Sequence, residues 1–156
     1  MTSGYFMIYL ATDHRGFQLK ELLKKFLVAR GNAIEDYGAF TYDKDDDYVD
    51  FAALAAQKIA ENSSEHKGIF LCGSGHGVDI VANKFKNIRA ALCWNKEVAQ
   101  QSREHGDANV LVLPADWMDE KHAEEIVKIW LETPFRNEER HVRRLEKVKN
   151  IEKDVG

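Results

Sequence analysis

Short apolar segments recur along the chain, and longer segments with amphipathic spacing separate them. Each short segment is rich in apolar and β-branched residues and has the length of a strand that is buried on both faces of a sheet. The predicted strands are Phe6–Ala11, Ala33–Tyr37, Gly68–Cys72, Ala90–Cys93 and Val110–Leu113. The pattern therefore predicts a five-stranded sheet whose strands are joined by helices.

The connecting segments have helical periodicity. In the first of them, apolar residues recur three and four positions apart from Leu19 to Leu27, and Gly31 follows as a helix stop. The predicted helices are Phe17–Arg30, Asp50–Glu61, Val78–Phe85, Lys96–His105 and Glu120–Leu131. Because strands that alternate with helices form parallel sheets, we predict an α/β fold with a doubly wound, Rossmann-like parallel sheet in a three-layer sandwich.

A further amphipathic helix is predicted at Asn137–Asp154, after Pro134 and beyond the last strand. Its apolar residues are spaced by three: Val142, Leu145, Val148 and Ile151. Such an appended helix can pack on its own domain or reach a partner subunit, and the sequence leaves both options open. No linker or repeat divides the chain, so residues 1–156 are expected to form one domain.

Composition and charge narrow the class of protein. The chain has 156 residues, 44% of them apolar, which is enough for a core, and its apolar runs are too short to span a membrane. The first residues lack the features of a signal peptide, and two cysteines make no disulfide framework, so we expect a cytoplasmic protein. The net charge of −4 gives no reason to expect a nucleic-acid or membrane partner.

Three polar clusters are candidates for a site. Thr12–Gly16 and Cys72–Gly77 follow the first and third predicted strands, and Arg103–Asp107 precedes the fifth. Ligands of open parallel sheets bind outside the carboxyl ends of the strands, where these clusters could converge. The acidic run Asp43–Asp47 is instead expected to be a solvated loop.

The second cluster is a glycine-rich loop. Gly73, Gly75 and Gly77 allow backbone N–H groups to turn toward an anion, although a plain tight turn needs the same residues. The GxGxG spacing after the third strand is neither a Walker loop nor the GxGxxG fingerprint, which argues against a nicotinamide cofactor.

Cys72 ends the third predicted strand, directly before this loop. A thiol at that place can act as a base or a nucleophile, and the alternative is a small buried apolar residue. Cys93 lies within a strand and has no such loop, so we expect it in the core.

The basic side chains offer an anion site but no metal site. The histidines show none of the spacings typical of metal ligands. His14 and His105 lie in the polar clusters, which makes them candidates for the site. Arg140 and Arg144 lie about one turn apart on the last helix and could clamp a phosphate, the alternative being a solvated basic face.

Five segments together resemble the ribose-5-phosphate isomerase B and galactose-6-phosphate isomerase family. They are DHRGFQLKE (13–21), DDYVDFA (46–52), GIFLCGSGHGVDIVANKFKNIRAAL (68–92), REHGDANVLVLP (103–114) and ERHVRRLEKV (139–148). The resemblance implies a doubly wound homodimer that isomerises a sugar phosphate without a cofactor at sites between subunits. A tetramer, in which two such dimers pair, is left open.

The resemblance also implies roles for single residues. Cys72 falls where the family has its catalytic base, and Ser74 falls where the enediolate oxygen is stabilised, together with the loop amides. The other matching positions are Asp13 and Tyr48 at the sugar, His105 at ring opening, and His14, Arg140 and Arg144 at the phosphate. His76 lies in a variable position of the loop from which it could face the substrate.

Two departures from the family pattern affect the substrate. Gly106 replaces a usual asparagine, and Asp116 replaces a usual arginine that contacts phosphate. We expect conversion of ribose 5-phosphate to ribulose 5-phosphate. The alternatives are an isomerase of another four- to six-carbon sugar phosphate, a catalytically silent sugar-phosphate-binding module, and, on fold analogy alone, a nucleotide-binding regulator.

Overall fold

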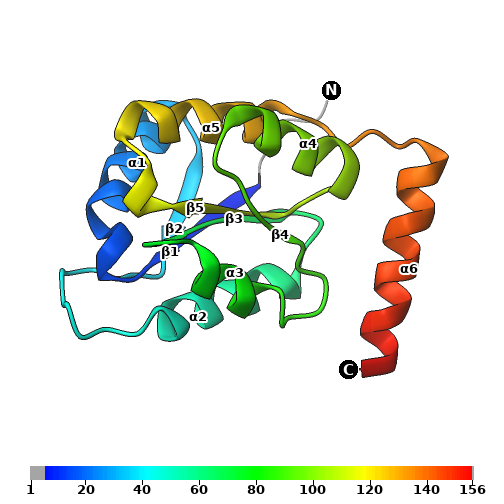
Figure 1. Cartoon of the computed structure of the whole chain (residues 1–156), viewed down its shortest axis with the longest axis horizontal. Coiled ribbons are helices and arrows are strands. Elements are labelled where there is room, and N and C mark those ends of the chain that lie inside the picture. The colour runs from blue at the N-terminus through cyan, green and yellow to red at the C-terminus, as the bar shows by residue number, and fades with distance from the viewer. Residues whose placement is uncertain (1–5, 156) are drawn as a thin grey trace.

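The computed structural model describes residues 6–155, and its centre is a sheet of five parallel strands. The strands are β1 (Met7–Thr12), β2 (Ala33–Asp36), β3 (His66–Cys72), β4 (Ala90–Leu92) and β5 (Val110–Pro114). Their order across the sheet is β2-β1-β3-β5-β4 (Figure 1). The predicted fold class is therefore confirmed.

Helices cover both faces of this sheet. One face carries α1 (Phe17–Ala29), α4 (Lys96–Gly106) and α5 (Glu120–Glu132), and the other carries α2 (Tyr48–Glu61) and α3 (His76–Ala82) (Figure 1). Two short 3₁₀ turns, η1 (His14–Gly16) and η2 (Ala115–Trp117), follow β1 and β5. The last helix, α6 (Glu139–Val155), stands apart from the three layers.

The core lies in two layers, one on each face of the sheet. Successive residues of a strand point to opposite faces, so Ile8 and Leu10 pack with α1 and α5, whereas Tyr9 and Ala11 pack with α2. The three central strands are buried almost throughout. They form the rigid support from which the loops at their carboxyl ends project.

The two edge strands differ from the prediction of strands buried on both faces. In β2, exposed and half-buried residues alternate, and β4 is only half-buried. Each has a neighbour on one side only, so solvent reaches its outer side. A short apolar segment has the same sequence pattern whether its strand lies at the edge of the sheet or in the centre of the sheet.

Helix boundaries agree with the prediction to within one residue for α1, α4 and α5, whereas α2 begins two residues earlier than predicted and α6 two residues later. Gly31 has a φ of +83° and follows α1, as expected of a helix stop. However, α3 runs over His76–Ala82 instead of Val78–Phe85, since it starts directly after Gly75. The predicted helix there was right in type and wrong by two to three residues in place.

The helix α6 makes few contacts with its own domain. His141 is its one buried residue within the described part of the chain. The apolar residues Val142, Val148 and Ile151 are between 38% and 61% exposed. Near both ends α6 contacts its own domain: the His141 ring stacks on His105, and Glu152 accepts a hydrogen bond of 2.8 Å from the Asn87 amide. Contact with a partner subunit, the other option that the sequence left open, stays a prediction. No helix within residues 6–155 is long and apolar enough to cross a membrane.

Candidate active site

A pocket of about 440 Å³ opens at the carboxyl end of the sheet. Its walls come from the loops after β1, β3 and β5 and from the first turns of α2 and α3. The lining residues are Asp13, His14, Arg15, Tyr48, Cys72, Gly73, Ser74, His76, Gly77, Ile80 and Asp116. The pocket therefore combines segments from most of the chain.

The register of the strands explains why these loops meet. Thr12 pairs with Leu71, and Cys72 pairs with Pro114, so β1, β3 and β5 end at the same level. Loops that leave parallel strands at one level surround a common space. The predicted clusters after β1 and β3 converge there, whereas the cluster Arg103–Asp107 lies elsewhere, at the carboxyl end of α4.

The chain turns sharply after Cys72. The turn passes through Gly75, whose φ of +81° favours glycine, and a Cβ there would lie 2.6 Å from Leu92 Cδ1. The Ser74 hydroxyl accepts a hydrogen bond of 3.2 Å from the His76 amide. The loop thus holds the thiol of Cys72 and the hydroxyl of Ser74 in one wall of the pocket.

Gly77 has a packing role beside its place in the loop. A Cβ on Gly77 would lie 2.5 Å from the ring atom Cε1 of Tyr48. The aromatic ring therefore lies directly against the backbone of α3, where only a glycine leaves room for it. Because Tyr48 is the first residue of α2, this contact fixes its ring in the wall of the pocket.

Asp13 is a buried carboxylate at the base of the first loop. Its side chain accepts a hydrogen bond of 2.9 Å from the Arg15 amide, and the residue is 6% exposed. Burial raises the pKa of the Asp13 carboxyl, against the opposing effect of that hydrogen bond. The residue can thus hold its proton to a higher pH than a solvated aspartate.

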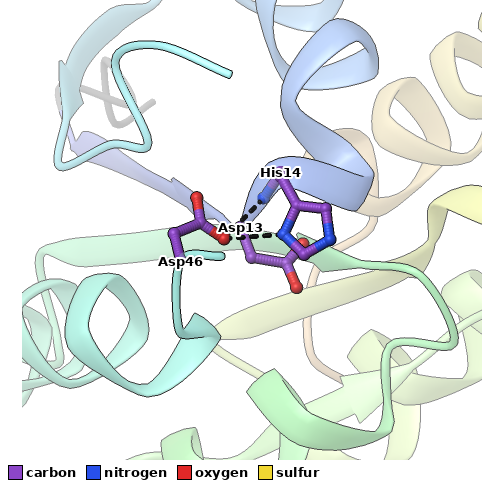
Figure 2. Close-up of side chains that lie close together, drawn as sticks. All are labelled: Asp13, His14 and Asp46. Atoms are coloured by element: carbon purple, nitrogen blue, oxygen red, sulfur yellow. Dashed lines mark hydrogen bonds and ion pairs between the residues drawn. The ribbon is translucent and has the colours of Figure 1, made fainter. Parts of the chain in front are cut away.

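Asp46 is a pocket neighbour that the sequence analysis missed. We expected the whole acidic run Asp43–Asp47 to be solvated, and this was wrong for Asp46, whose side chain is 9% exposed. Its Oδ1 accepts a hydrogen bond of 3.0 Å from the His14 amide and lies 2.7 Å from the ring atom Nδ1 (Figure 2). The strand order could have indicated it: β2 lies beside β1, so the loop after β2 reaches the same end of the sheet as the loop after β1.

Arg15 and Asp116 form an ion pair across the pocket. The guanidinium bonds both carboxylate oxygens, with 3.2 Å from Nε to Oδ1, and joins residues 101 positions apart. A Cβ on Gly73 would lie 2.8 Å from Asp116 Oδ2, so the pair lies against this glycine. The sequence predicts that Asp116 replaces an arginine that would bind phosphate. In the structure, Asp116 forms an ion pair with Arg15.

Asp13, His14 and Asp46 are close enough to act as ligands of one metal ion. One donor atom from each lies within 4.8 Å of the others. Nδ1 of His14 is already engaged by Asp46, so only Nε2 is left as a ligand from this ring. The sequence had predicted no metal site.

Three predicted site residues lie outside the pocket of their own chain. His105 is near the end of α4, and its ring stacks on that of His141, with centroids 4.4 Å apart. Arg140 and Arg144 are on α6, where Arg140 pairs with Glu138. None of the three lines the pocket that contains Cys72, and Figure 1 shows α6 at the far end of the molecule.

The family of the chain follows from a sequence comparison. The sequence model of the family described as Ribose/Galactose Isomerase matches residues 8–148. The chain belongs to the ribose/galactose isomerase family. This confirms the resemblance seen in the five sequence segments, and it covers all five strands of the sheet but for the first residue of β1.

Relatives named for this isomerase activity match nearly the whole chain. The probable ribose-5-phosphate isomerase B of Mycoplasma genitalium is 38% identical over 150 residues, which are 96% of this chain and 98% of the relative. The ribose-5-phosphate isomerase B of Escherichia coli K12 is 37% identical over 145 residues, covering 93% and 95%.

Solved structures of ribose-5-phosphate isomerases B have the same fold. The crystal structure of the Mycoplasma genitalium protein with bound ribulose-5-phosphate matches with a TM-score of 0.92 at 38% identity, over 95% of this chain and 97% of that one. The Clostridium thermocellum protein matches with a TM-score of 0.91 at 37% identity, over 97% and 100%. This chain is therefore similar to isomerases in both sequence and structure.

Proposed function

We propose that this chain is an aldose–ketose isomerase that interconverts ribose 5-phosphate and ribulose 5-phosphate. The observation that carries the proposal is the match to the Mycoplasma genitalium structure, which holds ribulose-5-phosphate. The pocket at the carboxyl ends of β1, β3 and β5 supports it, because a thiol, a hydroxyl and a carboxylate line one cavity there.

In the proposed reaction, the Cys72 thiolate removes the proton from C2 of the open-chain aldose. The Cys72 thiol then returns a proton to C1, while the proton of the C2 hydroxyl passes to the oxygen on C1. Negative charge develops on the carbonyl oxygen of the enediolate. The Ser74 hydroxyl and the amides of the glycine loop stabilise this charge. Ser74 Oγ accepts its bond from the His76 amide, so its own O–H is free to donate toward the substrate.

The sugar and phosphate contacts follow the roles that the resemblance implies. Asp13 and Tyr48 contact the sugar, and His76 faces it from the start of α3. His105 opens the sugar ring, and His14, Arg140 and Arg144 bind the phosphate. No cofactor or metal ion takes part in this scheme.

We infer a homodimer, alone or paired into a tetramer, with its sites between subunits. Arg140, Arg144 and His105 lie outside the pocket of their own chain, so in this proposal a second copy supplies them. The exposed apolar residues of α6 support this, because a partner surface would cover them. The two cysteines are unpaired, which suits a reducing compartment such as the cytoplasm.

A screen of sugar phosphates tests the proposed function. Tetrose, pentose and hexose aldose phosphates are incubated with the protein, and ketose formation is followed by NMR. We expect the fastest conversion with ribose 5-phosphate. Faster conversion of another sugar phosphate would show that this sugar is the substrate. This is the main alternative, because Asp116 lines the pocket where the family usually has an arginine. No conversion of any sugar would leave a silent binding module.

A further inference from the structure

Asp46 differs from its neighbours in the acidic run. Asp43, Asp45 and Asp47 are exposed, as the sequence predicts, whereas the Asp46 side chain is 9% exposed. One of its carboxylate oxygens, Oδ2, is buried and has no hydrogen-bond partner. A buried carboxylate needs a compensating positive charge or several donors, so its surroundings call for an explanation.

The side chain that Asp46 faces is His14. Asp46 Oδ1 binds both the backbone N–H and the ring Nδ1 of His14, at 3.0 and 2.7 Å (Figure 2). The distance of 2.7 Å is typical of a charge-assisted hydrogen bond. An ionised carboxylate only accepts, so Nδ1 carries a proton in this arrangement, and Nε2 is the nitrogen left for the pocket.

A second residue of the same loop also touches His14. The ring of Tyr42 meets the His14 ring edge to face, with centroids 5.9 Å apart and an angle of 90°. The start of the loop is held to β1, since the Thr12 amide donates to Gly38 and the Ala39 amide donates to Thr12, both at 2.8 Å. A loop anchored in this way can hold the imidazole in one orientation.

We propose that Asp46 is a positioning residue that prepares His14 to bind the phosphate of the substrate. It holds the ring with Nδ1–H toward the loop and supplies the negative charge that an imidazolium needs. Donation to Asp46 and to a phosphate oxygen at once requires protons on both ring nitrogens, and a charged ring has them. The inference rests on the proposed function, because His14 is taken there as a phosphate ligand.

The test compares Asp46→Ala and Asp46→Asn with Asp45→Asn. Asp45→Asn removes the same charge from an exposed neighbouring position and serves as the matched control. Loss of the support should raise KM for ribose 5-phosphate on the order of tenfold, with a smaller change in kcat. The inhibition constant of inorganic phosphate should rise in parallel, and Asp45→Asn should change neither. Asp46→Asn keeps the shape of the side chain, so it provides the test if the alanine variant fails to fold.

A spectroscopic readout separates this inference from the proposed function. Long-range ¹⁵N–¹H spectra of the histidine rings report which ring nitrogen of His14 carries a proton, and a His14→Gln variant assigns its signals. We expect a protonated Nδ1 in the wild type and altered His14 signals in Asp46→Ala. This result needs no isomerase activity, so it stands or fails apart from the proposed reaction.

Three results would overturn the role of Asp46. Unchanged His14 signals in Asp46→Ala would show that the carboxylate does not set the state of the ring. An unchanged KM and phosphate inhibition in both variants would show that it does not act on the anion. Loss of activity after dialysis against a chelator, restored by a divalent cation, would make Asp13, His14 and Asp46 metal ligands instead.

Discussion

Cys72 and Cys93 have the same side chain in different surroundings. Cys93 is completely buried, as predicted, and burial raises the pKa of its thiol to about 11. Cys72 is also largely buried, but it lines the pocket. A thiol must be deprotonated and accessible to react, so the two should differ strongly in reactivity.

We therefore predict that iodoacetamide modifies Cys72 and leaves Cys93 unmodified at neutral pH. Peptide mass mapping over time measures both rates, and ribose 5-phosphate should protect Cys72. Cys72→Ala provides the control, since it should take up no label while folded. Equal labelling of the two cysteines, or a rate at Cys72 that the sugar phosphate does not change, would contradict this account.

At the scale of residues, the sequence was informative where a motif is local. The glycine loop with Cys72 and Ser74 could be found because its residues are consecutive. Asp46 and the Arg15–Asp116 pair could not, because their partners are 32 and 101 positions away along the chain. A charged residue in a polar run carries no local sign of the partner that buries it.

At the scale of elements, a buried ion pair holds the loop that carries Asp46. Lys20 on α1 is fully buried, and its Nζ lies 2.7 and 2.8 Å from the two carboxylate oxygens of Asp36 and 2.6 Å from the Ala39 carbonyl oxygen. Burial alone would raise the pKa of the Asp36 carboxyl. Hydrogen bonds from Lys20 and the Gly38 amide outweigh it and hold this pKa below its usual range.

Lys20→Met should therefore destabilise the protein by about 3 kcal/mol at pH 7, because it leaves a buried carboxylate without its main partner. A carboxyl with a lowered pKa contributes stability above the pKa of the unfolded chain and loses it as the pH falls. The difference between wild type and variant should thus shrink below about pH 4. Urea unfolding at several pH values measures it.

Lys24→Met is the matched control for this prediction. Lys24 bonds the same carboxylate at 3.1 Å, but its side chain is 39% exposed. An exposed partner contributes at most about 1 kcal/mol. Equal losses of stability in the two variants would contradict the view that burial makes the Lys20 bond strong.

The sequence predicted the type of each helix and strand and their order along the chain. It did not predict which elements lie next to one another in space. The alternation of apolar strands and amphipathic helices predicted five parallel strands and the helices between them. It could not tell that Ala33–Asp36 and Ala90–Leu92 form the edges, because the strand order depends on contacts across the sheet. The position of α6 also depends on what it contacts, and the spacing of its apolar residues does not encode that.

The arginines of α6 give a prediction for this element. Arg140→Ala or Arg144→Ala should raise KM for ribose 5-phosphate more than it lowers kcat, because a phosphate contact exists equally in ground and transition states. The lost charge-assisted bond is worth about 1.5–3 kcal/mol. Steady-state kinetics measures the change. Arg143→Ala is the control, since Arg143 is paired with Glu139 one turn away, and similar effects in all three would indicate a general loss of charge.

At the scale of the whole molecule, the account requires two chains in each site. Cys72→Ala and Arg140→Ala damage different halves of the proposed site. When the two inactive or weakened proteins are unfolded together and refolded, mixed dimers should carry one intact site. At a ribose 5-phosphate concentration far below the raised KM of Arg140→Ala, activity should then recover to about a quarter of the wild-type level, since half of the dimers are mixed and half of their sites are intact.

A mixture of Cys72→Ala and Ser74→Ala is the control for this recovery. Both residues line the pocket of the same chain, so every site in that mixture keeps one defect. We expect no recovery there. Recovery in the control, or none in the test mixture, would contradict sites shared between subunits.

The central claim is that Cys72 moves the proton that distinguishes aldose from ketose. The most direct measurement is exchange of the C2 hydrogen of ribose 5-phosphate with solvent in D₂O, followed by proton NMR. The wild type should incorporate deuterium at C2 as the two sugars equilibrate. Cys72→Ala should exchange on the order of a hundredfold more slowly with an unchanged circular dichroism spectrum. Exchange at the wild-type rate in folded Cys72→Ala would contradict the account.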